Sequence, residues 1–135
     1  MKTVIKFIIG IIVLVLIAYM IIINLPKASS TNKTASLSIS ATELFSEFSS
    51  DEAKANKKYI GKIIEVEGTV LNTHRDKQNA LVIILDSGDA MGSVLCTLEK
   101  DPAEIPQKSQ HVSIKGQCNG LLMDVVLNKC ILLNS

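Results

Sequence analysis

The sequence is poor in aromatic residues and contains no tryptophan. Its 135 residues include two tyrosines and three phenylalanines, 4% in all. Beyond the first 26 residues, only Phe45, Phe48 and Tyr59 are aromatic. Proteins that bind single-stranded nucleic acid stack the bases on aromatic side chains beside a basic groove. The scarcity of aromatic residues therefore argues against that class of function.

The sequence also lacks an excess of charge of either sign. It holds 14 basic and 13 acidic residues, a formal net charge of +1. Two of the basic residues, Lys2 and Lys6, lie in the first 26 residues, so the rest has 12 basic against 13 acidic residues, a net charge of −1. A domain so close to neutral cannot hold a polyanion by charge alone. Nucleic acid is therefore disfavoured as a partner.

Recognisable catalytic and metal-binding motifs are missing as well. The only histidines, His74 and His111, are far apart, and neither a GxSxG elbow nor a CxxC pair occurs. Metal centres and serine hydrolases depend on such spacings. We therefore expect no metal, no cofactor and no enzymatic activity. The alternative is an enzyme whose active site follows no recognisable motif.

The three cysteines have no spacing that indicates a metal site. Cys96 and Cys118 fall on alternating apolar positions, and Cys130 lies in the last apolar segment. Free cysteine commonly behaves as a small buried hydrophobe, which predicts core thiols. A disulfide is the alternative, because an exported domain can meet an oxidising compartment. The sequence does not select a pair.

One long apolar run dominates the start of the chain. Phe7–Leu25 is nineteen residues without a charge, and at ~1.5 Å per residue it spans about 28 Å, close to the hydrocarbon thickness of a bilayer. The preceding Lys2 and Lys6 predict an N-terminus in the cytoplasm and the rest on the periplasmic or extracellular side. The length favours a retained signal-anchor in a single-pass membrane protein. A cleaved signal peptide, with Ala28-Ser29-Ser30 near its cleavage site, is the alternative.

The composition divides the chain into three parts. Residues 1–26 form the predicted transmembrane anchor, and residues 27–39 are rich in Ser, Thr, Ala and Asn, which is typical of a flexible tether. Residues 40–135 form the predicted domain. It opens with a capping box at Ser40, where a helix should begin, and a second cap at Asp51. Gly61 supplies the helix stop.

From residue 62 onward the apolar pattern changes from helical to alternating, which predicts strands. Five strands follow, with turn residues or prolines between them and a predicted hairpin turn at Asn119-Gly120. Their expected ranges are 62–75, 81–85, 93–98, 111–118 and 123–133. Gly68 and Gly116 fall in the middle of the first and fourth strands, where a strongly coiled strand needs a residue without Cβ. The sequence therefore predicts an all-β protein, a five-stranded OB-fold barrel preceded by an α-helix.

Several short motifs carry a resemblance to a known family. They are AxELxxxF…AxxxYIGKxIEVxGxV at residues 41–70, VLC at 94–96, VSIKGQCNG at 112–120 and DVVLNKCIL at 124–132. Together they resemble the bacterial envelope family of tRNA-anticodon-binding-like OB-fold proteins (tRNA_anti-like). The resemblance covers about residues 40–133 and implies a short, membrane-tethered or lipoprotein chain with an OB fold. This sequence has no cysteine directly after its apolar segment that could accept a lipid.

OB barrels usually bind ligands on their second and third strands and on the loops that follow the first and fourth strands. Mapped onto this sequence, that surface gives the candidate ligand-binding residues His74, Arg75, Lys77, Leu95, Thr97, Asn119 and Gly120. We therefore expect a membrane-anchored, non-enzymatic binding module whose ligand is a protein, a peptide or a small envelope molecule. A nucleic-acid-binding OB-fold protein is the alternative.

Overall fold

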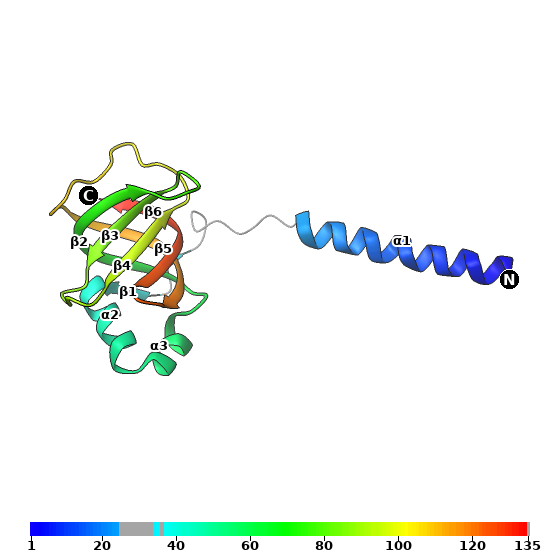
Figure 1. The fold of residues 1–135 in the computed structure, drawn as a ribbon, viewed down its shortest axis with the longest axis horizontal. Coiled ribbons are helices and arrows are strands. Elements are labelled where there is room, and N and C mark those ends of the chain that lie inside the picture. Colours follow the sequence, from blue (N-terminus) through cyan, green and yellow to red (C-terminus); the bar gives the residue numbers. More distant parts are fainter. Residues whose placement is uncertain (25–33, 36, 135) are drawn as a thin grey trace.

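The computed structural model describes residues 1–24, 34–35 and 37–134. A small barrel carries two short helices at one end, and a long N-terminal helix stands apart from it (Figure 1). The helices are α1 (Lys2–Asn24), α2 (Ala41–Ser50) and α3 (Glu52–Tyr59). The strands are β1 (Leu37–Ser40), β2 (Ile63–Arg75), β3 (Leu81–Asp86), β4 (Ser93–Leu98), β5 (His111–Leu121) and β6 (Val125–Asn134).

Helices α2 and α3 begin at side-chain caps. The Ser40 hydroxyl accepts a hydrogen bond from the Glu43 backbone N–H at 3.1 Å, and the Asp51 carboxylate accepts one from the Lys54 N–H at 3.1 Å. Such caps satisfy backbone donors that have no partner within the helix. The chain leaves α3 through Gly61, whose φ of +77° suits a residue without Cβ. Both predicted helix starts and the predicted stop are confirmed.

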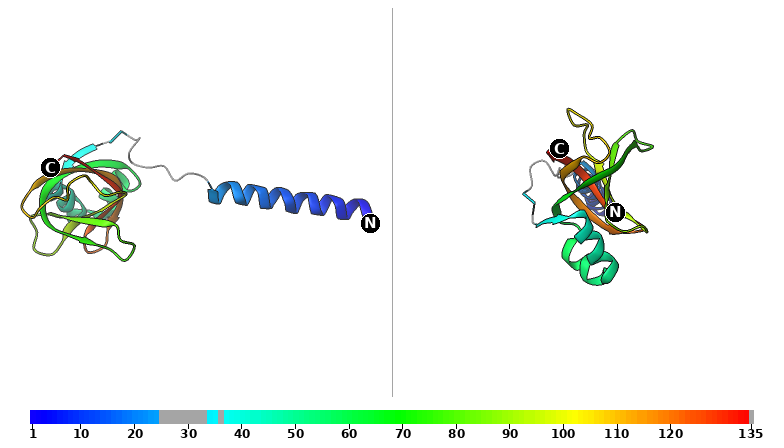
Figure 2. Two further views of the ribbon diagram at one scale, coloured as in Figure 1. Left: turned by 90° about the horizontal axis from the view of Figure 1, so that it is seen from above. Right: turned by 90° about the vertical axis from the view of Figure 1, so that its left-hand side faces the viewer.

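Strands β2 to β6 close into a barrel with mixed pairing. Each neighbour in the order β2-β3-β4-β6-β5 is hydrogen-bonded, and β5 returns to pair with β2. Only the β4–β6 pair is parallel within this ring; the other four pairs are antiparallel. Figure 2 shows the strands wrapping around a common interior. The predicted five-stranded OB-fold barrel preceded by a helix is confirmed.

A further short strand lies outside the ring. β1 pairs in parallel with the first half of β2, with Leu37 opposite Ile64 and Ser40 opposite Glu67. The sequence assigns residues 37–39 to the tether, which therefore ends earlier than predicted. Residues 27–33 and 36 of that tether lie outside the described residues. β1 leads directly into α2 and fixes where that helix begins against the barrel.

The turn between the last two strands differs from the sequence prediction. Asn119 and Gly120 lie inside β5, which continues to Leu121, and the chain reverses at residues 122–124. The prediction of a turn at Asn119-Gly120 is therefore wrong. Gly120 uses its φ of +104° at an irregularity of the β5–β6 ladder, between the pairs Cys118–Leu127 and Gly120–Val126.

One apolar core fills the barrel and continues under the helices. Alternate residues of every strand in the ring are buried there, including Val66, Ile83 and Leu127. The two central glycines have a packing reason: a Cβ on Gly68 would lie 3.0 Å from that of Ala41, and one on Gly116 would collide with the Cys130 thiol. The rings of Phe45, Phe48 and Tyr59 are all buried beneath α2 and α3. These two helices therefore close one end of the barrel.

Helix α1 is long and apolar enough to cross a bilayer. The span that meets both conditions is Lys2–Ile21, and its residues are exposed throughout. An apolar surface of this extent is unfavourable in water, whereas it suits a membrane interior. A signal sequence satisfies the same conditions.

Candidate binding face

The outward side chains of β3, β4 and β6 form an apolar row. Ile84 lies opposite Leu95, and Leu95 lies opposite Val126. Residues directly opposite in a ladder share one face of the sheet. These three side chains are partly exposed, whereas the residues on either side of each along the chain are buried. Asn72 of β2 continues the row on one side, opposite Ile84. The strands thus present an apolar stripe, Ile84–Leu95–Val126, on the outside of the barrel.

A second row runs beside the apolar stripe. His74 lies opposite Val82, and Val82 lies opposite Thr97. His74 is exposed and Thr97 partly exposed, but Val82 is only 6% exposed. The register therefore brings three predicted residues, His74, Leu95 and Thr97, onto the same face.

Of the two predicted cations, Arg75 is engaged within the protein. Its guanidinium donates to both carboxylate oxygens of Asp101, at 2.8 and 2.7 Å, and to the Asn79 carbonyl at 2.9 Å. These bonds hold the pKa of Asp101 below its ordinary value. Lys77 is exposed in the turn between β2 and β3. Arg75 therefore ties this turn to the β4–β5 connection and has few donors left for a ligand.

Asn119 and Gly120 lie near the opposite end of the face, close to α3. Asn119 is exposed, whereas Gly120 is buried. A Cβ on Gly120 would lie 3.1 Å from the Ile60 side chain, and Ile60 itself is 46% exposed. Because Gly120 also lies opposite Val126, Ile60 extends the apolar stripe towards the helices.

An acidic row follows the apolar stripe on its other side. Asp86 lies opposite Ser93 in the β3–β4 ladder. The Asp124 carboxylate accepts hydrogen bonds from the Ser93 backbone N–H at 2.7 Å and from the Ser93 hydroxyl at 2.8 Å. Asp86 and Asp124 are therefore both neighbours of Ser93, and each lies two residues along the chain from a member of the stripe, Ile84 or Val126.

The central strands of the face carry no positive charge. The sequence from Leu81 to Leu98 contains no Lys, Arg or His, while it contains Asp86 and Asp89. All the aromatic residues beyond the first 26, namely Phe45, Phe48 and Tyr59, are buried. A surface of this kind offers neither a basic groove nor a stacking platform.

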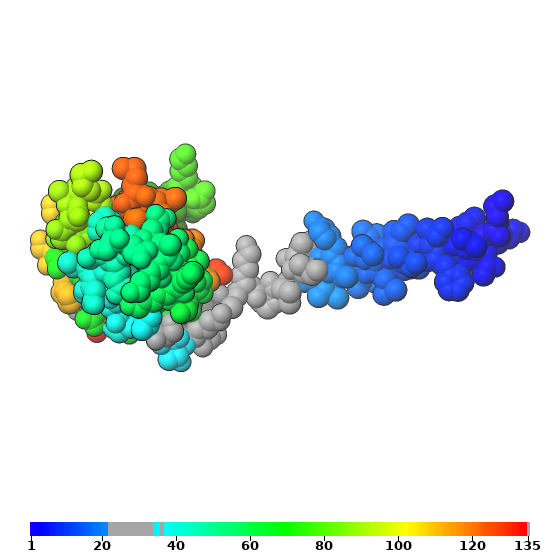
Figure 3. Space-filling view, turned by 90° about the horizontal axis from the view of Figure 1, so that it is seen from below, coloured from blue at the N-terminus to red at the C-terminus, as the bar shows by residue number. Residues whose placement is uncertain are grey.

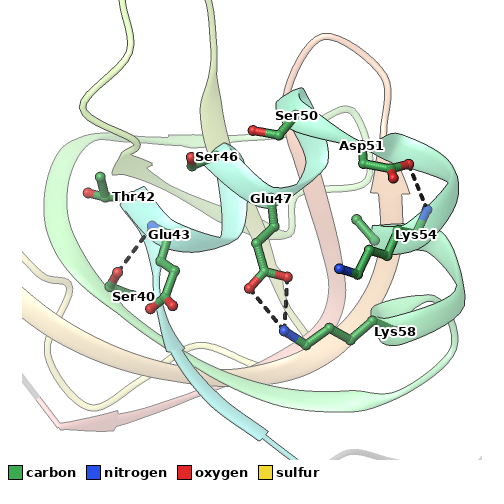
Figure 4. A pocket seen from close by; sticks show the side chains of 10 residues that line it. Ser40, Thr42, Glu43, Ser46, Glu47, Ser50, Asp51, Lys54 and Lys58 are labelled. Carbon is green, nitrogen blue, oxygen red and sulfur yellow. Dashed lines mark hydrogen bonds and ion pairs between the residues drawn. The ribbon is translucent and has the colours of Figure 1, made fainter.

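A separate hollow lies between α2 and α3, with a volume of about 550 Å³ (Figure 4). Its walls carry serine and threonine hydroxyls together with the Glu47–Lys58 ion pair, whose atoms are 2.9 Å apart. Glu47 also accepts a hydrogen bond from the Tyr59 hydroxyl at 2.8 Å. The hydrogen bond from Lys58 is the main reason that the pKa of Glu47 lies below its ordinary value. These charged groups are already satisfied by one another and join α2 to α3.

The three cysteines face the interior of the barrel. Cys96, Cys118 and Cys130 are all fully buried free thiols. Burial raises the pKa of Cys118, and it raises the pKa of Cys130, whose thiol also lies in hydrogen-bonding contact with Cys96. Among the residues that the structure describes, no group of three or more His, Cys, Asp or Glu side chains is placed to hold a metal ion.

The face also contains residues that the sequence alone does not single out. Ile84 and Val126 belong to the apolar stripe, Ile60 extends it, and Asp86 and Asp124 belong to the acidic row. Ile84 lies in an uninterrupted apolar run, where the sequence does not distinguish inward from outward positions. The pairing with Leu95 shows that Ile84 points outward.

Comparison with known proteins gives matches by family and by structure. Comparison with curated proteins gives no match. The crystal structure of a "putative nucleic acid-binding lipoprotein" from Klebsiella pneumoniae is similar with a TM-score of 0.58 and 15% identity, covering 73% of this chain and 93% of that one. That of a "putative aspartyl-tRNA synthetase" from Leishmania major gives a TM-score of 0.48 and 13% identity, covering 82% of this chain and 23% of that one.

At 15% identity, the similarity to the Klebsiella protein shows a shared fold and nothing further. The family comparison reaches further along the chain: the tRNA_anti-like model matches residues 1–132. The strand order and the closing β2–β5 pair are those of a five-stranded OB barrel. The chain therefore belongs to the tRNA_anti-like family, and its folded domain is an OB-fold domain of the tRNA-anticodon-binding-like type.

Proposed function

We propose that this chain is a non-enzymatic binding module. Helix α1 anchors it in a membrane, and the barrel, which with its helices is the domain of residues 40–135, lies outside the cytoplasm. Its ligand is a protein, a peptide or a small envelope molecule, bound on the outer face of β3, β4 and β6.

The observation that carries the ligand class is the outward stripe Ile84–Leu95–Val126. In a small barrel whose core is already full, apolar side chains on the outside of three adjacent strands gain free energy only when a partner covers them. Leu95 is the central member, with one neighbour on each side. A ligand that buried this stripe would bind mainly by apolar contact.

Nucleic acid is the competing ligand, because the Klebsiella neighbour carries that description in its name. In this chain the candidate face has no cation between Leu81 and Leu98. Arg75 is held by Asp101, and the aromatic rings of the barrel domain are buried. Phosphate binding depends on basic side chains, and base stacking depends on exposed rings. These features favour the apolar ligand.

The membrane side is supported by the charges that flank α1. Lys2 and Lys6 precede the apolar segment, and no acidic residue occurs in the first 26 residues. By the positive-inside rule this places the N-terminus in the cytoplasm. Protease added to cells whose cytoplasmic membrane is intact, with any outer membrane permeabilised, should therefore digest the barrel domain, while a tag at Met1 stays protected.

Photo-cross-linking in native membranes tests the ligand class. We would place p-benzoylphenylalanine at Leu95 of the full chain and, as a matched control, at Lys115, which lies on the β2–β5 side of the barrel. The adduct at Leu95 should contain a protein, a peptide or a small envelope molecule, identified by mass spectrometry, and the Lys115 variant should not form it. A nucleic acid adduct at Leu95 would contradict the proposal.

A further inference from the structure

The most exposed large apolar side chains of the barrel domain gather on two neighbouring loops. Met91 is 83% exposed in the β3–β4 loop, and Leu122 and Met123 are 87% and 79% exposed in the β5–β6 turn. The loops touch: the Met123 carbonyl oxygen lies 2.7 Å from the position that a Cβ on Gly92 would take. Figure 3 shows the yellow-green β3–β4 loop and the orange β5–β6 turn projecting on the same side of the domain. We call these three residues the methionine patch.

Hydrogen bonds within the loops hold the patch in place. The Met91 N–H donates to the Asp89 carboxylate at 2.8 Å, and the Ser87 hydroxyl donates to the Gly92 carbonyl at 2.5 Å. In the other loop the Leu122 N–H donates to the Asp124 carbonyl at 3.1 Å. The apolar side chains therefore project from ordered backbone, which lowers the entropy cost of binding a partner. Methionine adapts well to the shape of an apolar partner.

The two loops that carry the methionine patch hold only negative charge. Asp89 and Asp124 lie on the two loops, within two residues of the patch, and Asp86 ends β3, where the first loop begins. No Lys, Arg or His occurs in residues 81–98 or 116–128, the segments that supply both loops, β3, β4 and the adjoining parts of β5 and β6. The hydrogen bonds that these carboxylates accept all use Oδ1. The second oxygen of each is therefore left for a cationic partner.

We propose that the methionine patch and its three aspartates dock a peptide segment of a partner protein, in which apolar side chains are flanked by lysine or arginine. The apolar side chains cover Met91, Leu122 and Met123, and the cations pair with the carboxylates. Complementary charge of this kind selects the partner and speeds its association. The inference rests on the proposed function, because it names the partner chemistry of the same outer face.

The charge pattern selects this occupant over a bilayer. Anionic lipid surfaces attract lysine and arginine and repel carboxylates, and the loops that would touch the surface, together with the adjoining end of β3, carry three aspartates and no cation. A second copy of the same surface would bring those aspartates against one another, because a two-fold interface places a patch on its own image. A basic, apolar peptide meets neither obstacle.

Binding to defined peptides tests the proposal. The full chain in zwitterionic nanodiscs is titrated into fluorescent 12-residue peptides of Lys and Leu, of Lys and Ser, and of Glu and Leu, with empty nanodiscs subtracted. The Lys/Leu peptide should bind at least tenfold more tightly than either of the others. The variant M91S/L122S/M123S should lose at least tenfold in affinity for it, and so should D86N/D89N/D124N. A control variant, L133S, should bind like the wild type, since Leu133 is also exposed but lies at the far end of β6.

An environment-sensitive fluorophore at L122C distinguishes the other occupants. Its emission should shift to the blue only when the Lys/Leu peptide is added. If the emission is already blue-shifted without peptide and quenchers attached to the lipid reduce it, the patch contacts the bilayer. If the blue shift grows with protein concentration, the patch contacts a second copy of the chain. Either result overturns the inference, as does equal affinity for the three peptides.

The patch and the wider face can fail separately. If Leu95→Glu abolishes Lys/Leu peptide binding while the patch variants leave it unchanged, the inference falls and the proposed function stands. If no peptide binds and oligonucleotides bind through Lys77, both fall. Circular dichroism and thermal unfolding of each variant show whether the fold is retained, and Asp124→Asn alone replaces the triple aspartate variant should that variant unfold.

Discussion

Ile84 and Leu95 are direct partners across the β3–β4 ladder, and both point away from the barrel interior. Their neighbours Ile83 and Cys96 are partners in the same ladder and are fully buried. One pair thus belongs to the outer face and the adjacent pair to the core. Every proposal about ligand binding depends on this separation.

The first prediction tests that separation with two adjacent substitutions. Leu95→Glu should keep the fold, with a loss of less than about 1 kcal/mol, because the new carboxylate remains in water. Val94→Glu should cost more than about 3 kcal/mol, because Val94 is fully buried and an unpaired charge would enter the core. Urea unfolding of the full chain followed by circular dichroism gives both values. Equal destabilisation by the two variants would contradict the assignment of faces.

The second prediction concerns the contact between α2 and the β3–β4 loop. A Cβ on Gly92 would lie 2.5 Å from the Phe45 ring and 2.7 Å from the Met123 carbonyl oxygen. Gly92→Ala should therefore destabilise the barrel by about 1–3 kcal/mol, the usual range for overpacking. Gly10→Ala is the matched control, because nothing lies within 4 Å of its added Cβ. Thermal unfolding that is unchanged by Gly92→Ala would show that this contact does not hold α2 on the barrel.

The third prediction is a pH dependence at the α2–α3 junction. The pKa of Glu47 is lowered in the folded chain, chiefly by the hydrogen bond from Lys58. The stability it contributes is therefore fully present above its ordinary value of 4.5 and is lost as the pH falls through the lower folded value. Because both side chains are partly exposed, the contribution should stay below about 1 kcal/mol.

Glu47→Gln and the exposed control Glu67→Gln measure that contribution. In urea titrations, Glu47→Gln should be less stable than the wild type at pH 7, and the difference should shrink towards zero at pH 3. The control should show no such trend. A difference of the same size at both pH values would mean that the ionised carboxylate is not the source of the stability.

The fourth prediction concerns the thiols of the barrel interior. Burial excludes reagent from Cys96, Cys118 and Cys130 and raises the pKa of the last two, so the reactive thiolate is suppressed. Ellman's reagent at pH 8 should find no fast-reacting thiol in the folded chain and three after denaturation without reductant. One thiol after denaturation would instead show that two of the cysteines are joined in a disulfide.

The helices and strands could be predicted wherever local chemistry decides them. Ser40 and Asp51 cap their helices through bonds to N–H groups three residues ahead, so the sequence itself holds both partners. The alternation around Val66 identified β2 for a similar reason, since one of its faces is buried and the other is not.

The errors occurred where tertiary contacts override a local signal. Asn119-Gly120 is a strong turn signal, but Gly120 packs beneath Ile60 of the α3–β2 connection and stays in β5. β1 forms because it pairs in parallel with β2. Its four residues are too few for an alternating pattern to predict a strand from the sequence. The acidic row likewise depends on Asp124 reaching Ser93, 31 positions earlier in the chain.

The fifth prediction tests the central claim that the binding face is not built for nucleic acid. Fluorescence anisotropy of the full chain in zwitterionic nanodiscs, with labelled single-stranded DNA and RNA at physiological salt, should show no binding tighter than micromolar. Arg75→Ala and Lys77→Ala should leave that weak binding unchanged. Nanomolar binding that falls steeply with salt and is lost in either variant would contradict the account, because phosphate contacts by those two cations would then hold the ligand.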